Sequence, residues 1–293
     1  MKKRTFRKAE PYLWIAPSIV LMAIFIIVPI FFVFRTAFSE VSKSGLIKGF
    51  NGFDNFAKVL SNPDFALVLK NTLVWTIFVV VLSTVLGFIV ALLLNNKFRG
   101  RKIARAIVVF PWATTLVVQA SIWTFIINTD FGTLNTLLRT LGIIETNINW
   151  TPTPEAWFAW EIACGIFVTI PFVCFTALSG LQGIDSSYYE AATVDGANYW
   201  QKLFHITVPL VKPSLTVATV LNIIYVFNSF PIIWTMTKGD PAHMTSTLVT
   251  YLYKLAFYNG KQGEAAAVSV IGFLILLVCA SIYMVSTLKK GDE

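Results

Sequence analysis

The apolar residues of this chain come in long runs, not in the alternation of period 2 or 3.6 that marks water-facing strands and helices. About 20 consecutive apolar residues cross a bilayer as a helix, because lipid offers no hydrogen-bond partner to an open backbone. Six stretches are long enough, at about residues 13–34, 72–94, 103–127, 162–181, 215–236 and 265–287. The pattern therefore predicts an all-α polytopic membrane protein, with residues 1–293 forming one domain of six transmembrane helices.

Composition points to the same class of protein. Hydrophobic residues make up 56% of the 293 residues and charged residues only 13%, with a mean hydropathy of +0.70. A soluble domain carries about 25% charged residues. Cys164, Cys174 and Cys279 fall inside predicted spans without the spacing of metal ligands, and His205 and His243 are far apart in the sequence. We therefore expect no metal, no cofactor and no catalytic site.

The net charge of +8 is best explained by membrane topology. The basic residues stand just outside apolar runs, without the aromatic interleaving of a nucleic-acid surface. Lys and Arg in short flanking segments are retained on the cytoplasmic side. Most of the basic residues fall on one side of a six-span protein, in residues 2–8, 97–105 and 289–290. The longer segment 35–71 lies on the other side and holds five basic residues together with acidic ones. This distribution predicts that both termini are cytoplasmic.

The polar segment between the fourth and fifth spans, residues 183–213, is too patterned to be an idle linker. Ser187 and Glu190 have the spacing of a capping box that starts a helix, and Gly196 supplies the left-handed residue that ends it. Asn198 with Gln201 repeats the start signal, and we expect Pro209 and Pro213 to stop the second helix. The pattern predicts a cytoplasmic helix–turn–helix, here called the coupling loop.

An aromatic and apolar face is predicted on the second helix of the coupling loop. Trp200, Leu203, Phe204 and Thr207 recur at spacings of three and four and would share that face. The face needs a partner. Periodicity alone leaves two possibilities open: the ends of the protein's own helices, or a groove on another protein.

The coupling loop resembles the EAA loop of the permease subunits of ABC importers. The matching residues are Glu190-Ala191-Ala192, Asp195-Gly196-Ala197, Phe204, Ile206, Pro209 and Pro213. Segments outside the loop, at residues 53–56, 71–72, 239–241, 255–257 and 263–267, are similar to the carbohydrate branch of these permeases. One departure is Val208, where the family usually has Leu. The resemblance covers nearly the whole chain.

The resemblance implies how the loop works and with what. Glu190 would contact a separate ATPase, Gly196 would permit the bend, and the following helix would insert into a cleft of the ATPase. The residues assigned to ATPase coupling are Glu190, Ala191, Ala192, Asp195, Gly196, Trp200, Phe204, Ile206 and Pro209. The implied partners are an ABC ATPase dimer, a second permease subunit and an extracytoplasmic substrate-binding protein, in a bacterial inner membrane.

The energy source is expected to lie outside the chain. The sequence has no GxxxxGK[ST] phosphate-binding loop and hence no sign of its own nucleotide site. An ion-coupled carrier or channel, the competing class, would need ionisable groups inside the bundle. Arg105 and Glu264 stand near predicted span ends. We expect Glu161 to be a boundary residue, because it follows the outer-interface tryptophans Trp150, Trp157 and Trp160.

Uncharged polar and aromatic residues in the predicted spans favour a sugar as the transported solute. Hydroxyl-rich ligands bind amides and flat rings, whereas an anion would need Arg or Lys. Asn222, Tyr225 and Ser229 fall at i, i+3 and i+7 and would share one helical face. The candidate substrate residues are Asn228, Ser229, Asn222, Tyr225 and Gln119, with Trp123 nearby and Thr250 and Tyr251 added by resemblance. Two alternatives remain: these groups bridge helices, or the permease carries another solute such as phosphate or an amino acid.

Overall fold

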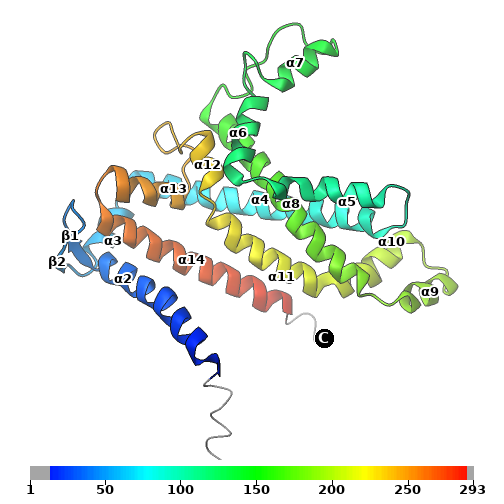
Figure 1. Ribbon diagram of the computed structural model, residues 1–293, viewed down its shortest axis with the longest axis horizontal. Coiled ribbons are helices and arrows are strands. Elements are labelled where there is room, and N and C mark those ends of the chain that lie inside the picture. Colours follow the sequence, from blue (N-terminus) through cyan, green and yellow to red (C-terminus); the bar gives the residue numbers. More distant parts are fainter. Residues whose placement is uncertain (1–13, 289–293) are drawn as a thin grey trace, which may run out of the picture. The chain divides into compact units, whose positions relative to one another are not determined.

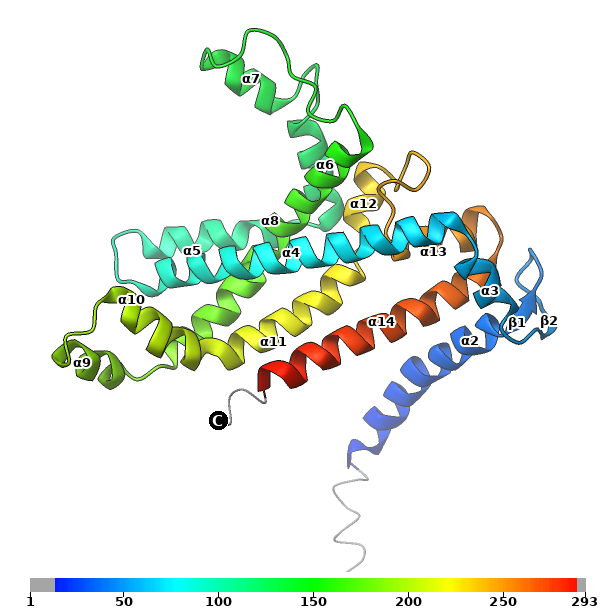
Figure 2. The same cartoon turned by 180° about the vertical axis from the view of Figure 1, so that it is seen from behind.

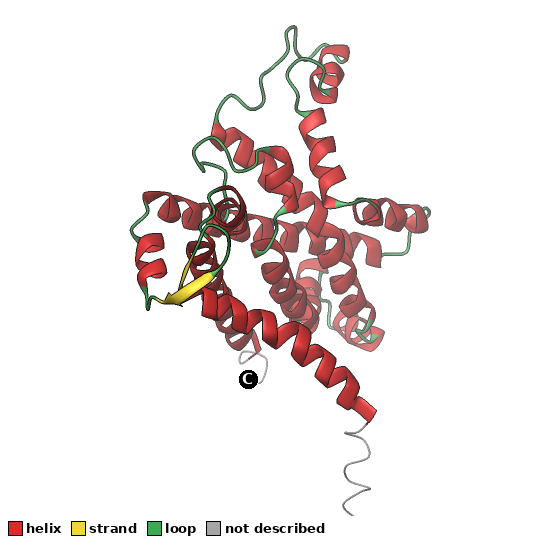
Figure 3. Cartoon of the chain, turned by 60° about the vertical axis from the view of Figure 1, so that its left-hand side comes forward, coloured by secondary structure: helices red, strands yellow, loops and turns green. Residues whose placement is uncertain are grey.

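The computed structural model describes residues 14–288, so the predicted basic tail at residues 2–8, Leu13, and Lys289 and Lys290 lie outside the described residues. The described chain consists of helices joined by loops, together with one two-stranded hairpin (Figure 3). It groups into two compact units, residues 14–63 with 252–273 and residues 64–251 with 274–288. The all-α class predicted from the sequence is confirmed.

The first unit is built around the first and last spans. Its elements are the continuous helical stretch Trp14–Ala37, which includes the π-turn η1 (Ala23–Ile27) and α2 (Val28–Ala37), then β1 (Ser39–Val41), β2 (Ile47–Phe50), α3 (Asp54–Leu60), the π-turn η4 (Lys254–Tyr258) and the first half of α14 (Gln262–Leu288). The strands pair antiparallel, with Ser39 opposite Phe50. The buried Asn55 amide fixes the hairpin to the end of α2, because its Nδ2 donates to the carbonyls of Ala37 and Ser39, each at 2.9 Å.

The second unit is a bundle whose main helices are α4 (Pro63–Asn95), α8 (Pro154–Gln182) and α11 (Val208–Phe227). Its smaller elements are α5 (Arg101–Val109), the 3-10 helix η2 (Phe110–Ala113), α6 (Leu116–Ile126), α7 (Thr133–Thr140), α9 (Ser186–Val194), α10 (Tyr199–Lys202), the π-turn η3 (Leu203–Thr207), α12 (Pro231–Met236) and α13 (Leu248–Tyr253). The hairpin α9–α10 lies at one end of the α8–α11 pair and α12 at the other (Figures 1 and 2).

Small residues bring these helices into close contact. A Cβ atom on Gly87 would stand 2.8 Å from the Val173 Cβ, and one on Gly165 would stand 2.8 Å from the Trp75 ring. Close approach through small residues is the usual way that helices associate in lipid, where no hydrophobic force drives them together. The packing of α4 against α8 therefore depends on these two glycines.

Buried hydrogen bonds complement this packing. The Trp75 indole Nε1 donates to the Val226 carbonyl at 2.9 Å, and the Asn222 Nδ2 donates to the Ser83 hydroxyl at 2.9 Å. The Leu248 N–H donates to the Thr72 hydroxyl at 2.8 Å. These bonds tie α4 to α11 and to the start of α13.

Proline inside an apolar run predicts a kink or a local opening of the backbone, and the third predicted span, residues 103–127, is bent next to Pro111. The stretch is broken into Arg101–Ala113 and Leu116–Ile126, which are bent by 100° relative to each other. Pro111 lies in the 3-10 turn and has no N–H to continue the ladder. Buried Gln119 bridges the break, because its Nε2 donates to the Pro111 carbonyl at 3.2 Å and to the Thr114 hydroxyl.

The other predicted spans correspond to helices that are mostly longer than expected. Five described helical stretches are long and apolar enough to cross a membrane: Trp14–Ala37, Pro63–Asn95, Pro154–Gln182, Tyr199–Met236 and Gln262–Val285. The bent pair is a sixth candidate if its two halves form one span. The stretch Tyr199–Met236 differs most from the prediction, since it begins at Tyr199 rather than near residue 215.

Glu161 is not a boundary residue. Its side chain is 0% exposed, and its Oε1 accepts a hydrogen bond from the Thr237 hydroxyl at 2.6 Å. The Thr237 hydroxyl also lies 2.7 Å from that of Thr245 and accepts from the Gly239 N–H at 3.0 Å. The sequence expectation failed because the neighbouring tryptophans pack inward here: the Trp160 Nε1 donates to the Trp150 carbonyl at 3.1 Å. Glu161 thus anchors the segment that follows α12.

Replacing Gly87 by Leu should destabilise the second unit by about 1–3 kcal/mol, because the new side chain must displace Val173 or separate α4 from α8. Thermal unfolding of the purified protein in detergent would measure the loss. Gly49→Leu is the matched control, since a Cβ there meets nothing within 4 Å. Equal melting temperatures for the two variants would contradict the close-contact argument.

Gln119→Leu should cost about 1–3 kcal/mol of stability, because the substitution leaves the Pro111 carbonyl without its buried donor. Denaturant unfolding would report the change. Ser121→Ala on the same helix is the control, since the Ser121 hydroxyl is exposed and bonds only to the Val117 carbonyl of its own helix. A Gln119 variant as stable as the Ser121 variant would show that the bend does not depend on this bridge.

Candidate functional site

The coupling loop forms a helical hairpin of α9 and α10. Its first helix does not start with the predicted Ser187–Glu190 capping box; instead Asp185 is the N-cap, and its carboxylate accepts the Ser187 N–H at 2.8 Å. This hydrogen bond lowers the pKa of the Asp185 carboxyl. The prediction placed the cap two residues late, because Asp, like Ser, is a strong N-cap residue and stood just upstream. Glu190 is therefore left exposed on the surface of α9.

The turn between the two helices has the predicted form. Gly196 adopts a φ of +78°, the left-handed conformation in which glycine carries no steric cost. The Asn198–Gln201 capping box is confirmed: the Gln201 N–H donates to Asn198 Oδ1 at 2.9 Å, and the Asn198 N–H donates to Gln201 Oε1 at 2.8 Å. The bend and the start of the second helix are thus fixed by local chemistry.

The two prolines do not end the second helix, which corrects the sequence expectation. Helix α10 continues through the π-turn η3 into α11, where Pro209 occupies the first turn and Pro213 lies inside. In the π-turn the Val208 N–H donates to the Leu203 carbonyl, five residues back. This wider turn restarts the helix immediately before Pro209, and proline is tolerated in a first turn because its missing N–H has no intrahelical partner there.

Only part of the predicted apolar face of the second helix packs against the protein itself. Leu203 and Thr207 are buried against the protein itself, and the Thr207 hydroxyl lies 3.0 Å from the Tyr189 hydroxyl of α9. Trp200 and Phe204 are 63% and 60% exposed and stack on each other with ring centroids 6.1 Å apart. One side of the second helix therefore packs against the protein, and the neighbouring side exposes a stacked aromatic pair.

A cavity of about 340 Å³ lies within the second unit between α8, α11 and the 3-10 turn η2. Its lining residues are Trp112, Val168, Thr169, Phe172, Leu221, Asn222 and Tyr225. Trp112 stacks on Phe172 with ring centroids 6.1 Å apart. The cavity thus combines flat aromatic surfaces with an amide and a phenol.

Asn222 is the polar centre of this cavity. Its side chain is 1% exposed, and while Nδ2 donates to Ser83, Oδ1 accepts no hydrogen bond from the described residues. A buried amide oxygen without a donor is costly to leave unpaired. Asn222 therefore fits both of the predicted roles. Its Nδ2 bridges α11 to α4, and its Oδ1 is free to accept a hydrogen bond from a bound solute.

The structure does not bring all the predicted substrate residues to this cavity. Asn222 and Tyr225 line it, but Ser229 lies beyond the end of α11 at Phe227, so the predicted three-residue face is wrong. Asn228 caps that end, with its Nδ2 donating to the Ile224 carbonyl at 2.8 Å. Ser229 is buried, its hydroxyl has no hydrogen-bond partner among the described residues, and it is not one of the residues that line the cavity.

The remaining candidates have local contacts. Gln119 bridges the break in the third span, as described above. The Thr250 hydroxyl accepts the Thr247 N–H at 2.9 Å and caps α13, and Tyr251 is buried with its ring against His243. Trp123 packs between Trp160 and Phe167. None of these four residues lines the cavity.

Sequence reasoning missed Trp112, Thr169 and Phe172 as cavity residues. Trp112 was missed because the sequence predicts a kink at Pro111 but not its direction, and so not which helices Trp112 contacts. The Pro111-Trp112 pair inside an apolar run was the available signal, since proline in a span marks a local opening of the backbone.

Comparison with known proteins assigns the chain to a family. The family described as "binding-protein-dependent transport system inner membrane component" matches residues 83–288. A probable ABC transporter permease protein of Brucella suis is 45% identical over 97% of both chains. The trehalose/maltose transport system permease protein of Thermococcus litoralis is 33% identical over 96% of this chain and 95% of its own.

The fold is shared with a solved structure. A chain of a bacterial ABC transporter involved in the import of the acidic polysaccharide alginate superposes with a TM-score of 0.85, covering 98% of both chains at 22% identity. With more than half of the sequence matched and full-length relatives above 30% identity, the chain belongs to the binding-protein-dependent transport system inner membrane components, the permease subunits of ABC importers.

Proposed function

We propose that this chain is a permease subunit that translocates a carbohydrate delivered by an extracytoplasmic binding protein, with ATP hydrolysed by partner ATPase subunits. The observation that carries the proposal is the aromatic and amide cavity formed by Trp112, Asn222 and Tyr225. Two relatives of 33% and 32% identity, named for trehalose/maltose and sulfoquinovosyl glycerol transport, support a carbohydrate.

The chemistry of the cavity suits a sugar ring. An aromatic face such as that of Trp112 or Tyr225 covers the apolar C–H side of a pyranose, and the unpaired Asn222 Oδ1 accepts a hydrogen bond from a hydroxyl. No charged side chain lines the cavity. A neutral polyhydroxylated solute satisfies the buried amide without bringing an unpaired charge into the bundle.

The α9–α10 hairpin is the proposed coupling element. Trp200 and Phe204 form its docking surface. The other residues assigned to coupling lie beside that surface or determine its shape: Glu190, Ala191, Ala192, Asp195, Gly196, Ile206 and Pro209. Side-chain contacts hold the two helices of the hairpin together, so that it can move as one body. Lys202 Nζ donates to the Thr193 hydroxyl at 2.7 Å, and the Tyr189 and Thr207 hydroxyls lie 3.0 Å apart. Its second helix continues directly into α11, which lines the cavity.

The membrane setting follows from this assignment. We place the hairpin and both termini on the cytoplasmic side of a bacterial inner membrane, where the ATPase dimer would dock, and the binding protein on the other side. A second permease subunit would complete the translocation path. Uptake into liposomes that contain this chain alone, driven by an ion gradient, would instead favour a carrier or channel.

An anionic solute is the second candidate, and Arg105 is the observation that favours it. The Nε and Nη2 of its guanidinium are buried and donate to no partner among the described residues. A relative of 32% identity is named an sn-glycerol-3-phosphate transport system permease protein. Competition assays with neutral and acidic sugars would separate the two candidates.

Gly196→Val should uncouple transport from ATP hydrolysis, because a β-branched residue at a φ of +78° costs about 1–3 kcal/mol and displaces the turn. Uptake and ATPase stimulation in the assembled complex would be measured together. Gly142→Val is the matched control, since Gly142 is also left-handed, with a φ of +69°, and has open space around it. Normal uptake with the Gly196 variant would refute the coupling assignment.

Trp112→Ala should raise the substrate concentration for half-maximal uptake about two- to tenfold, the range expected when one aromatic contact is lost. Trp112→Phe keeps a stacking ring and should stay close to the wild type. Uptake of labelled sugar with saturating binding protein is the measurement. If both variants transported like the wild type, the cavity would not be part of the sugar path.

A further inference from the structure

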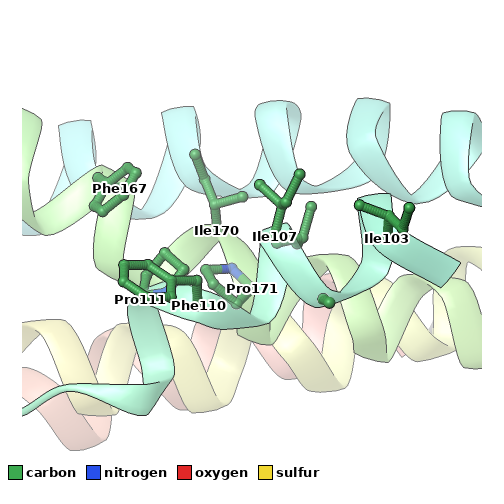
Figure 4. A pocket seen from close by; sticks show the side chains of 9 residues that line it. Ile103, Ile107, Phe110, Pro111, Phe167, Ile170 and Pro171 are labelled. Atoms are coloured by element: carbon green, nitrogen blue, oxygen red, sulfur yellow. The ribbon is translucent and has the colours of Figure 1, made fainter. Parts of the chain in front are cut away.

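A second hollow in the same unit is almost entirely apolar and lies on the outer side of α5. This groove, with a volume of about 540 Å³, is formed by Ile103, Ala106, Ile107, Val108, Phe110 and Pro111 together with Phe167, Ile170 and Pro171 of α8. Figure 4 shows the isoleucine side chains in a row along α5, ending at Phe110 and Pro111, with the α8 residues opposite. Ile103, Ile107 and Phe110 are each more than 60% exposed.

One end of the groove meets a cluster of positive charge. Residues 97–102, here called the basic segment, contain Lys97, Arg99, Arg101 and Lys102 and lead directly into the first turn of α5. Arg101 is committed elsewhere, because its Nε donates to the Leu94 carbonyl at 2.6 Å and so caps α4. Lys97, Arg99 and Lys102 are exposed, and no described residue forms an ion pair with them.

No acidic residue lies close to these cations in the sequence either. No Asp or Glu occurs between Asp64 and Asp130, a stretch that includes α4, the basic segment, α5 and α6. The first-turn N–H groups of α5 add partial positive charge, and no acidic residue occupies that turn. Within the described residues, therefore, no acidic residue close in sequence neutralises this end of α5.

The basic segment and the groove lie next to each other along α5. Lys102 stands one helical turn before Ala106, so the two share a face of α5, and Ala106 lines the groove. Nine helical residues of α5 span about 13 Å, close to the roughly 15 Å depth of one hydrocarbon leaflet. The site thus has a cationic end and an apolar trough of one leaflet's length.

We propose that the groove between α5 and α8 holds an acyl chain of an anionic phospholipid whose phosphate is bound by Lys97, Arg99 and Lys102. Basic residues next to a transmembrane helix attract anionic headgroups, and a groove that opens at that charge fixes where one lipid stays. The apolar trough alone would also fit a helix of a second permease subunit; the cationic end beside it is what favours an anionic lipid.

The test is lipid binding by the full chain, co-expressed with its ATPase and second permease and followed by native mass spectrometry. Phosphatidylglycerol and phosphatidylcholine of equal chain length would be titrated separately. We expect one phosphatidylglycerol to bind preferentially. The triple variant Lys97→Gln, Arg99→Gln, Lys102→Gln should lose affinity of the order of 100-fold, since each basic residue near an anionic surface contributes about fivefold.

Two further variants keep the test specific. Lys43→Gln, Lys48→Gln, Lys58→Gln removes the same net charge from another segment and should leave binding unchanged. Ala106→Trp keeps the cations but fills the groove, and it should weaken phosphatidylglycerol binding at least tenfold. Equal affinity of the wild type for the two lipids, or an unchanged preference in the basic-segment variant, would overturn the proposal. So would an Ala106→Trp protein that sheds its second permease subunit while keeping the lipid, because the groove would then be a subunit interface.

Discussion

A bilayer offers no partner to a backbone N–H or C=O, and most of this structure follows from that constraint. Where the helices are continuous, the backbone ladder satisfies these groups locally, except opposite Pro171 and Pro213, which have no N–H. Where the third span breaks at residues 113–116, side chains replace the missing bonds: Thr115 caps α6 and Gln119 reaches back to the Pro111 carbonyl. The break turns Trp112 toward α8 and α11, so the aromatic cavity exists only because the span is interrupted and repaired.

The same constraint explains the connection between the hairpin and the bundle. A helix that met Pro209 in its interior would lose a bond and clash with the preceding turn. The π-turn at residues 203–207 moves the proline into a first turn instead, and the Thr207 hydroxyl donates to the Lys202 carbonyl at 3.2 Å. The result is one continuous path from Trp200 to Asn222. That continuity gives the proposed coupling a mechanical route from the hairpin to the cavity.

Part of the candidate site was predictable. Gly196 and the Asn198–Gln201 box are local: each depends on residues within three positions, so sequence spacing alone identifies them. Asn222 and Tyr225 were found because their spacing of three holds inside a regular helix. Ser229 was misplaced because α11 ends at Phe227, and Glu161 because the direction in which its neighbouring tryptophans pack depends on α12 and not on their own segment.

The sequence by itself determined the class of protein, the number of apolar stretches and the turn chemistry of the hairpin, because hydrophobic runs and caps are short-range properties. Only the tertiary structure decided which stripe of the second hairpin helix is buried, how sharply the third span bends, and which polar groups meet in a cavity. The physical reason is that these features depend on contacts between residues far apart in the chain, such as Ser83 with Asn222 and Trp75 with Val226. Spacing along one helix carries no information about the surface that a second helix will present to it.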